Sequence, residues 1–176
     1  MSTYEDYSRA SPRYDETRVA VGTEIVLGAI AAGPVPLAGA AVLDAACGTG
    51  SYAAVLAPRV GSLSMLDADE GMLSVARRKL TPFKGVDCRL GRLQELPFED
   101  SSFDAVTTNQ ALHHLGDEEG GDWAEHAKVL AEYRRVLRPG GVLVVNTCSQ
   151  DQLRRGYCTT PSSLRPPSRC AGATPR

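Results

Sequence analysis

The fold of this chain is decided by the stretch Val42-Leu43-Asp44-Ala45-Ala46-Cys47-Gly48-Thr49-Gly50-Ser51-Tyr52. An apolar strand there runs into an acidic residue and then into a glycine turn. Because glycine has no Cβ, the backbone at Gly48 and Gly50 can turn sharply and approach a ligand closely. A helix beginning at Ser51 directs its free N–H groups toward the same place. The stretch therefore predicts a strand, a turn and a helix that together bind a nucleotide-type cofactor.

Two acidic residues restrict the class of cofactor that this stretch is expected to bind. Asp44 stands at the carboxyl end of the predicted strand, where a carboxylate attracts a cationic amine and repels a pyrophosphate. Asp67 closes the next apolar run, 63–66, about 20 residues after Gly48, and at this spacing a carboxylate accepts hydrogen bonds from ribose hydroxyls. The two acids, at adjacent strand ends, predict one crevice that binds an adenosine-type cofactor.

Strands and helices alternate along the rest of the chain. The run 86–90 is short and polar, as in a strand at a sheet edge, whereas 105–108 and 142–147 are apolar and β-branched, as in buried parallel strands. Asp69 is placed to cap a helix that ends near Lys79. Further helices are predicted at 15–32, 51–57 and 123–137, the last stopped by Pro139-Gly140-Gly141. This alternation predicts an α/β fold.

Four motifs occur in order along the chain. They are Asp44-Ala45-Ala46-Cys47-Gly48-Thr49-Gly50, Leu66-Asp67-Ala68-Asp69-Glu70-Gly71-Met72-Leu73, Leu96-Pro97-Phe98-Glu99-Asp100-Ser101-Ser102-Phe103-Asp104 and Val136-Leu137-Arg138-Pro139-Gly140-Gly141. From about Tyr14 to Thr147 the chain resembles the class I S-adenosylmethionine-dependent methyltransferases, in particular the small-molecule group with the methyltransferase type 11 pattern. The resemblance implies a Rossmann-like, doubly wound, mostly parallel sheet, S-adenosyl-L-methionine as cofactor and a small-molecule methyl acceptor.

The resemblance also implies a cofactor site. The methionine part of the cofactor lies near the glycine turn, the ribose at the second acid, the adenine beside apolar residues and the amino-acid end near Asn109. The residues implied in cofactor binding are Asp44, Ala46, Gly48, Gly50, Asp67, Ala68, Met72, Leu93 and Asn109.

Two residues depart from the family pattern. Ala46 stands where the usual motif has its first glycine, which adds one methyl group close to the cofactor. Arg92 stands where many relatives carry an acid that accepts a hydrogen bond from the adenine amino group, and arginine cannot accept one. Recognition of adenine is then expected from backbone groups around Leu93 and from apolar packing.

The pair His113-His114 follows the predicted strand 105–108 and is the candidate for acid–base catalysis, because neutral imidazole can take a proton at physiological pH. The alternative is that both belong to a loop and helix without a chemical role. Methyl transfer from a sulfonium needs little acid–base help, so most of the acceleration comes from holding the nucleophile, methyl group and sulfur in line. Cys47 is expected to be a packing residue rather than a nucleophile, and Arg134 and Arg135 are expected on a solvated helix face.

Composition favours a cytoplasmic enzyme. With 43% hydrophobic residues, 23% charged residues and a net charge of −2, the 176-residue chain can form one domain with a core. The apolar stretch 35–43 is too short to cross a bilayer, and the first residues lack a signal-peptide pattern. We therefore expect no membrane partner, and no nucleic-acid partner because no wide basic pattern with aromatics occurs. Five widely spaced cysteines without a CxxC pair indicate neither a disulfide framework nor a zinc site.

Residues 151–176 have the composition of a disordered, basic tail rich in proline, serine and arginine. Five arginines against one aspartate give +4 there, which leaves −6 on residues 1–150. We therefore expect a methyltransferase domain over 1–150, with an N-terminal arm and helix at about 1–35, followed by the tail. The family's sheet usually ends with two further strands, which we expect to be missing; a frame change near Tyr157 is one hypothesis for their loss.

Three functions are compatible with the sequence. The first is S-adenosylmethionine-dependent methyl transfer, and the second is a truncated relative that binds the cofactor without turnover as a regulatory protein. The third is an NAD(P)-dependent oxidoreductase, because the residues from Gly48 to Ala53 also fit G-x-G-x-x-A. Asp44 and the motifs that contain Pro97-Phe98 and Pro139-Gly140-Gly141 favour the methyltransferase.

Overall fold

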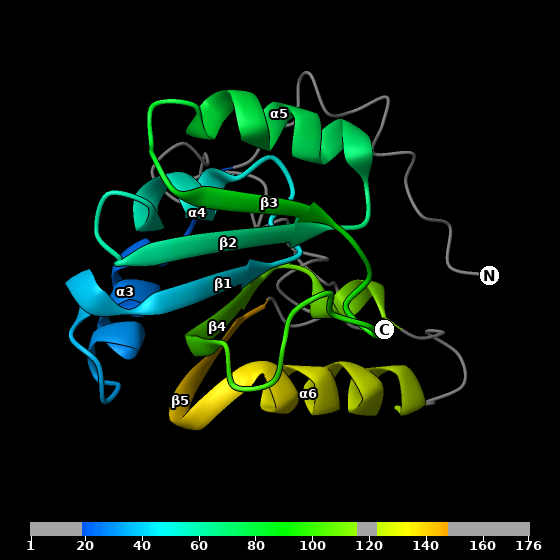
Figure 1. Ribbon diagram of the computed structural model, residues 1–176. Coiled ribbons are helices and arrows are strands. Elements are labelled where there is room, and N and C mark those ends of the chain that lie inside the picture. The colour runs from blue at the N-terminus through cyan, green and yellow to red at the C-terminus, as the bar shows by residue number, and fades with distance from the viewer. Residues whose placement is uncertain (1–18, 116–122, 148–176) are drawn as a thin grey trace, which may run out of the picture.

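The computed structural model describes residues 19–115 and 123–147, and within them five parallel strands form one sheet (Figure 1). The strands are β1 (Ala41–Ala45), β2 (Ser62–Asp67), β3 (Val86–Leu90), β4 (Phe103–Asn109) and β5 (Leu137–Asn146). Their order is β3-β2-β1-β4-β5, so the chain lays three strands outward and then returns to place β4 on the free side of β1. In such sheets the ligand binds at the carboxyl ends of the strands that flank this switch point, here β1 and β4.

Helices cover both faces of the sheet (Figure 1). The helices are α3 (Thr23–Ala31), α4 (Ser51–Leu56), α5 (Glu70–Leu80) and α6 (Ala124–Val136), with two short 3₁₀ helices, η1 (Leu37–Gly39) and η2 (Leu112–His114). The first three pack on one face and α6 on the other, and β1 contributes to both cores, because Val42 lies in the first and Leu43 in the second. The predicted doubly wound α/β fold is confirmed. None of the described helices combines the length and the apolar character that a membrane span requires.

Burial separates the central strand β4 from the strands at the two edges of the described sheet. All seven residues of β4 are buried, whereas β3 is half-buried or exposed, as predicted for an edge strand. The prediction that 142–147 is a buried strand is wrong. In β5 the side chains of Leu143 and Val145 are 37% and 42% exposed, because no strand among the described residues pairs with the outer edge of β5. The predicted tail, 151–176, lies outside the described residues.

Two predicted boundaries are also wrong. The helix predicted at 15–32 begins only at Thr23, because Gly22 has a left-handed backbone with a φ of 72°; residues 15–18 lie outside the described part. The last strand begins at Leu137, directly after α6, rather than at Val142. Its pairing with β4 is irregular until Val142, since Pro139-Gly140-Gly141 interrupts the register, and regular from there on.

The segment between β2 and α5 forms as predicted. Asp69 Oδ1 accepts a hydrogen bond from the Met72 N–H at 2.9 Å, which caps the amino end of α5. Three basic residues lie in the last turn of the helix, where the helix dipole favours cations: Arg77, Arg78 and Lys79. The cap fixes the start of α5. It thereby also fixes the short segment that joins the end of β2 to this helix, beside the glycine turn.

Candidate cofactor site at the strand ends

Three predicted site residues meet at the carboxyl ends of the central strands. Asp44 lies in β1, Asp67 ends β2 and Asn109 ends β4. Asn109 Nδ2 donates to Asp44 Oδ1 at 3.3 Å and to Thr107 Oγ1 at 2.9 Å, so the amide side chain crosses the switch point between β1 and β4. The negative charge of Asp67 also acts on Asp44. The sheet therefore brings Asp44 and Asp67 together at the strand ends, as the sequence predicts.

The glycine turn is tied to the end of β2 by backbone donors. The Gly48 N–H donates to Asp67 Oδ2 at 2.7 Å, and the Cys47 N–H donates to the Leu66 carbonyl at 2.9 Å. The other carboxylate oxygen, Asp67 Oδ1, accepts a hydrogen bond from the Asp69 N–H at 3.0 Å. The Asp67 carboxylate is therefore oriented by the chain itself. Because a carboxylate has about four acceptor positions, it can still accept bonds from the hydroxyls of a bound ribose.

The two glycines of the turn have different surroundings. A Cβ built on Gly48 would meet no atom within 4 Å, whereas one on Gly50 would lie 3.0 Å from Leu80 Cδ2 and 3.1 Å from Ala76 Cβ. Both residues have positive φ, and so does Ala46, at 61°. Ala46 thus adopts the left-handed backbone that normally favours glycine, at a cost of about 1–2 kcal/mol. Gly48 faces open space at the crevice, and Gly50 permits the contact between the turn and α5.

Alanine substitutions at the two glycines are expected to separate binding from stability. Gly50→Ala adds a steric clash with α5 to the backbone strain, so we expect it to lower the free energy of unfolding by about 2–4 kcal/mol. Gly48→Ala carries the same kind of strain without the clash, so it should cost about 1–2 kcal/mol and mainly block the cofactor. Urea denaturation and titration with S-adenosylhomocysteine measure both effects. Equal losses of stability in the two variants would contradict this assignment.

Asp44 is a buried carboxyl group with unsatisfied acceptors beside it. Its side chain is 1% exposed, and neither Asp44 Oδ2 nor Asn109 Oδ1 has a hydrogen-bond partner. Burial raises the pKa of Asp44 to about 7, against the opposing effect of the Asn109 hydrogen bond and with a further rise from the charge of Asp67. Burial also raises the pKa of Asp67. None of the ion pairs within the described ranges includes either acid. These acceptors therefore fit a cationic donor such as an ammonium group.

Of the residues predicted around adenine, Ala68 and Met72 follow β2, whereas Leu93 follows β3. Ala68 is exposed, Leu93 is half-buried and Met72 is buried. Arg92, the departure from the family pattern, is exposed and forms a single antiparallel bridge with Glu95. The assignment of Ala68, Met72 and Leu93 to adenine stays a prediction.

The predicted acid–base pair lies on η2, in the segment that leaves β4 at the crevice end of the sheet. The rings of His113 and His114 contact each other, with centroids 4.0 Å apart. Residues 116–122, which follow, lie outside the described part. The catalytic role of His113 and His114 stays a prediction. Cys47 is buried in the core, and burial raises the pKa of its thiol well above the usual value, in agreement with a packing role.

Sequence reasoning missed two polar residues near the site, Tyr52 and Asn146. They hydrogen-bond to each other and to Val21, which precedes α3. Asn146 ends β5 as Asn109 ends β4. A polar residue at the end of an apolar strand was therefore a signal for Asn146, as it was for Asn109. Tyr52 carried no comparable signal beyond its position two residues after the glycine turn.

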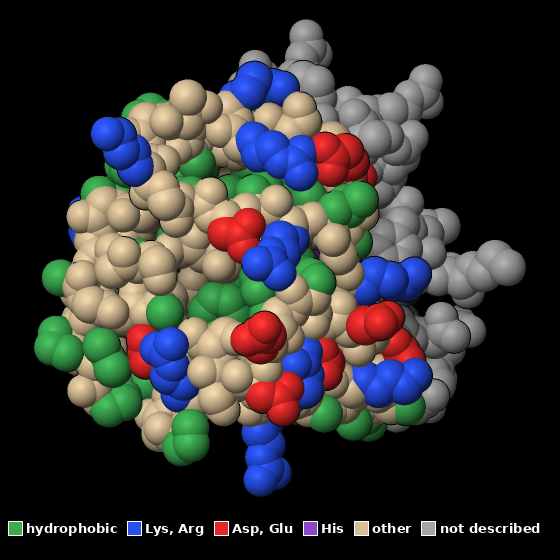
Figure 2. Space-filling model, viewed as in Figure 1, with side chains coloured by type: hydrophobic (Ala, Val, Ile, Leu, Met, Phe, Trp, Pro, Cys, Tyr) green, Lys and Arg blue, Asp and Glu red, His purple; other side chains and the backbone are tan. Residues whose placement is uncertain are grey.

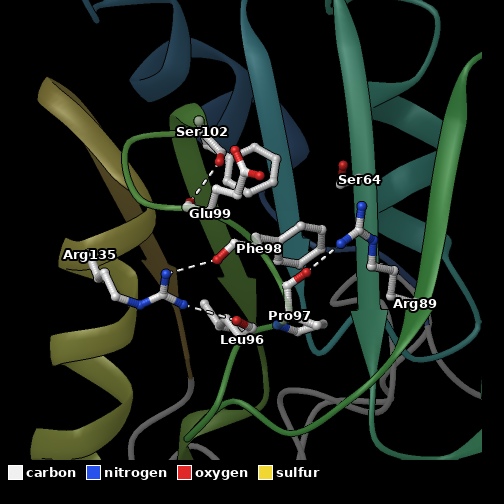
Figure 3. Close-up of a pocket in the computed structure, with 9 residues that line it drawn as sticks. Ser64, Arg89, Leu96, Pro97, Phe98, Glu99, Ser102 and Arg135 are labelled. Carbon is white, nitrogen blue, oxygen red and sulfur yellow. Dashed lines mark hydrogen bonds between the residues drawn. The ribbon is translucent and has the colours of Figure 1, made fainter.

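A hollow of about 720 Å³ lies away from the strand-end site, on the face of the sheet that α6 covers (Figure 3). Its lining residues are Ser64, Arg89, Leu96, Pro97, Phe98, Glu99, Ser102, Phe103 and Arg135. Arg134 is exposed as predicted, whereas Arg135 is half-buried, since it pairs with Glu132 and donates to the carbonyls of Leu96 and Phe98. Arg89 donates to the Pro97 carbonyl and stacks on Phe98. The charged groups thus stabilise the loop before β4, and none of the predicted cofactor residues lines this hollow.

Charges on the front face of the molecule are mixed. Figure 2 shows acidic and basic side chains interspersed there, without one continuous basic patch on that face. The expectation of no nucleic-acid partner rests on the sequence and stays a prediction.

The sheet order, the glycine turn and the acids at the ends of β1 and β2 define a doubly wound α/β domain of the class I methyltransferase type. The chain belongs to the methyltransferase-domain family, whose model matches residues 43–145. This family includes S-adenosylmethionine-dependent methyltransferases, and S-adenosylmethionine is the cofactor that the motifs predict. The family match therefore favours a methyltransferase over a dinucleotide-dependent oxidoreductase.

Individual relatives agree with this assignment. The chain is 39% identical to a demethylmenaquinone methyltransferase of Clavibacter sepedonicus over 125 residues, which cover 69% of this chain and 48% of the relative. The structure of S-adenosylmethionine-bound CalS10, an amino pentose methyltransferase from Micromonospora echinaspora, aligns with a TM-score of 0.64 and 28% identity over 85% of this chain and 59% of CalS10. A putative methyltransferase from Bacillus halodurans aligns with a TM-score of 0.59 and 30% identity, covering 78% of this chain and 57% of that one. The chain spans about half the length of the curated relatives it matches.

Proposed function

We propose that this chain binds S-adenosyl-L-methionine at the carboxyl ends of β1, β2 and β4 and transfers its methyl group to a small-molecule acceptor. The observation that carries the proposal is the buried Asp44 carboxyl group, whose Oδ2 has no hydrogen-bond partner and which no cation within the described ranges pairs with. A buried carboxyl group with one oxygen left without a donor is costly, and a ligand ammonium group would supply the missing donor and charge.

Each part of the crevice has a distinct role in this proposal. Asp44 and Asn109 bind the amino-acid end of the cofactor, and Asp67 accepts the ribose hydroxyls. Gly48 leaves the space that the cofactor occupies, since a side chain there would project into it. The bound cofactor supplies a methyl group already activated on a sulfonium. The chain's own contribution is to hold the cofactor in one orientation, so that the acceptor approaches in line with the methyl group.

The proposed acceptor class rests on the relatives. The curated relative from Clavibacter sepedonicus is named a demethylmenaquinone methyltransferase, and CalS10 is named an amino pentose methyltransferase. Both acceptors are small molecules. We therefore propose a small-molecule acceptor for this chain, rather than a protein or a nucleic acid, in the cytoplasm.

Ligand titration tests the proposal against its alternatives. We expect saturable binding of S-adenosylhomocysteine by the purified chain, and no saturable binding of NAD, in calorimetric titrations of the same preparation. Transfer of labelled methyl groups from S-adenosylmethionine into a small-molecule extract then distinguishes an enzyme from a relative that only binds the cofactor. Binding of NAD but not of S-adenosylhomocysteine would overturn the proposal, and binding without transfer to any acceptor would favour the non-catalytic alternative.

A further inference from the structure

Side chains from two elements, α4 and β5, converge on the backbone of Val21, which lies just before α3. The Val21 N–H donates to Tyr52 Oη at 3.0 Å, and the Tyr52 hydroxyl donates back to the Val21 carbonyl at 2.8 Å. Asn146 Nδ2 donates to the same carbonyl and to Tyr52 Oη, each at 3.0 Å. Both polar groups of the Val21 backbone are thus satisfied by side chains from α4 and from the end of β5. We call Tyr52, Asn146 and the Val21 backbone the Val21 latch.

The Val21 side chain contributes little to this attachment. It is 55% exposed, and Val19 is 62% exposed, so neither is buried in the core. The backbone at Val21 is therefore held by hydrogen bonds rather than by apolar packing of these two side chains. Removing one hydroxyl group should loosen it, while removing the Val21 side chain should not.

The latch is built on the same elements as the cofactor crevice. Tyr52 lies in the first turn of α4, two residues after Gly50 of the glycine turn. Asn146 holds Gln110, because the Gln110 N–H donates to the Asn146 carbonyl at 2.6 Å and Gln110 Nε2 donates to Asn146 Oδ1 at 3.3 Å. Gln110 has a left-handed backbone with a φ of 55° and directly follows Asn109, whose amide contacts Asp44. A continuous series of bonded or adjacent residues thus joins Val21 to Asp44.

We propose that Tyr52 and Asn146 are positioning residues that couple the attachment of the chain at Val21 to cofactor binding. This inference rests on the proposed function, since the coupled ligand is the cofactor of that site. A ligand that fixes the glycine turn and the Asn109 side chain also fixes the start of α4 and Gln110, from which the latch is built. The closed latch in turn lowers the entropy that cofactor binding must remove. Because coupling between two sites is reciprocal, each event favours the other by the same factor.

Hydrogen exchange at the Val21 amide tests the coupling, since that N–H is itself a latch donor. In the full chain we expect saturating S-adenosylhomocysteine to slow exchange of this amide by about fivefold or more. In Tyr52→Phe we expect faster exchange in the free chain, little further slowing by the ligand, and an affinity weaker by about the same factor. Asn146→Asp, which replaces the donor by an acceptor, should act in the same direction. Val21→Ala is the matched control and should change neither the protection of this amide, relative to its unfolded rate, nor the affinity.

The outcomes separate the coupling from the proposed function. If S-adenosylhomocysteine binds but leaves Val21 exchange unchanged, the coupling is wrong and the cofactor site stands. If Tyr52→Phe exchanges faster but binds the ligand with wild-type affinity, the latch is only structural. If the folded wild-type chain does not bind the ligand at all, the proposed function and the coupling both fail.

Discussion

Asp67→Ala is expected to weaken the binding of S-adenosylhomocysteine by at least about 100-fold, which corresponds to about 3 kcal/mol. Two hydrogen bonds from ribose hydroxyls to a carboxylate contribute about 1.5–3 kcal/mol each. The structure makes the carboxylate ready for them, because the Gly48 and Asp69 N–H groups already orient it. Asp67→Ala also removes the acceptor of these two N–H groups and leaves the Cys47 N–H bond to the Leu66 carbonyl to hold the glycine turn on β2, so the variant should lose about 1–3 kcal/mol of stability. Calorimetric titration and a thermal melt measure the two effects.

Asp69→Ala is the matched control for Asp67→Ala. It removes a neighbouring carboxylate that caps α5, so it should cost about 1 kcal/mol of stability, yet it removes no ribose acceptor in this account. We expect its affinity for S-adenosylhomocysteine to stay close to that of the wild type. A folded Asp67→Ala variant that binds as tightly as Asp69→Ala would refute the ribose assignment.

Asp44→Asn is expected to weaken cofactor binding and to stabilise the unliganded chain. The size of both effects should depend on pH. Burial raises the pKa of Asp44 to about 7, whereas an unfolded aspartate titrates near pH 3.9. Between these values the folded chain binds the proton more tightly, so its stability falls as pH rises from about 4 to about 7. Asparagine cannot ionise. The free energy of unfolding of the unliganded variant, relative to wild type, should therefore rise across this pH range and stay constant above it. At pH 8 we expect a difference of about 2–4 kcal/mol.

Cofactor affinity should follow the opposite course. The ammonium group of the ligand favours the charged carboxylate, so wild-type binding must release a proton whenever Asp44 is protonated beforehand. Affinity for S-adenosylhomocysteine is expected to rise about tenfold per pH unit below pH 7 and to level off above it. Asp44→Asn should bind at least about tenfold more weakly at pH 8 and lose this component of the pH dependence. Titrations from pH 6 to pH 8 in buffers of different ionisation enthalpy measure both quantities. Equal pH dependence in wild type and variant would exclude Asp44 as the titrating group.

Local patterns predicted the parts of the site that lie within one βα unit. The strand before the glycine turn, Asp67 and the Asp69 cap are each set by neighbours a few residues away, and the structure has them as expected. The parallel sheet then places Asp44 opposite Thr107 of β4, two residues before Asn109, whose side chain reaches Asp44. These residues could be found because their chemistry follows from position at a strand end.

Features that depend on distant contacts were not predicted. Asn146 reaches Val21 across 125 residues of sequence, and Arg135 donates to the Leu96 carbonyl across 39. No local pattern reports such pairs, so the latch and the contacts of Arg135 with the loop before β4 were missed. The exposure of Leu143 and Val145 differs from the burial that their apolar character predicts, but it agrees with the expectation that the family's last two strands are missing, because β5 is then an edge strand.

The central claim is that the cofactor binds at the ends of β1, β2 and β4, and chemical-shift mapping tests it most directly. S-adenosylhomocysteine is titrated into the ¹⁵N-labelled chain, and the amide shifts of each residue are followed to saturation. We predict the largest changes at Gly48, Ala68 and Gln110, with small changes at Arg89 and Phe98, which line the separate hollow. Saturating changes centred on Arg89 and Phe98, or none in a folded chain, would contradict the account.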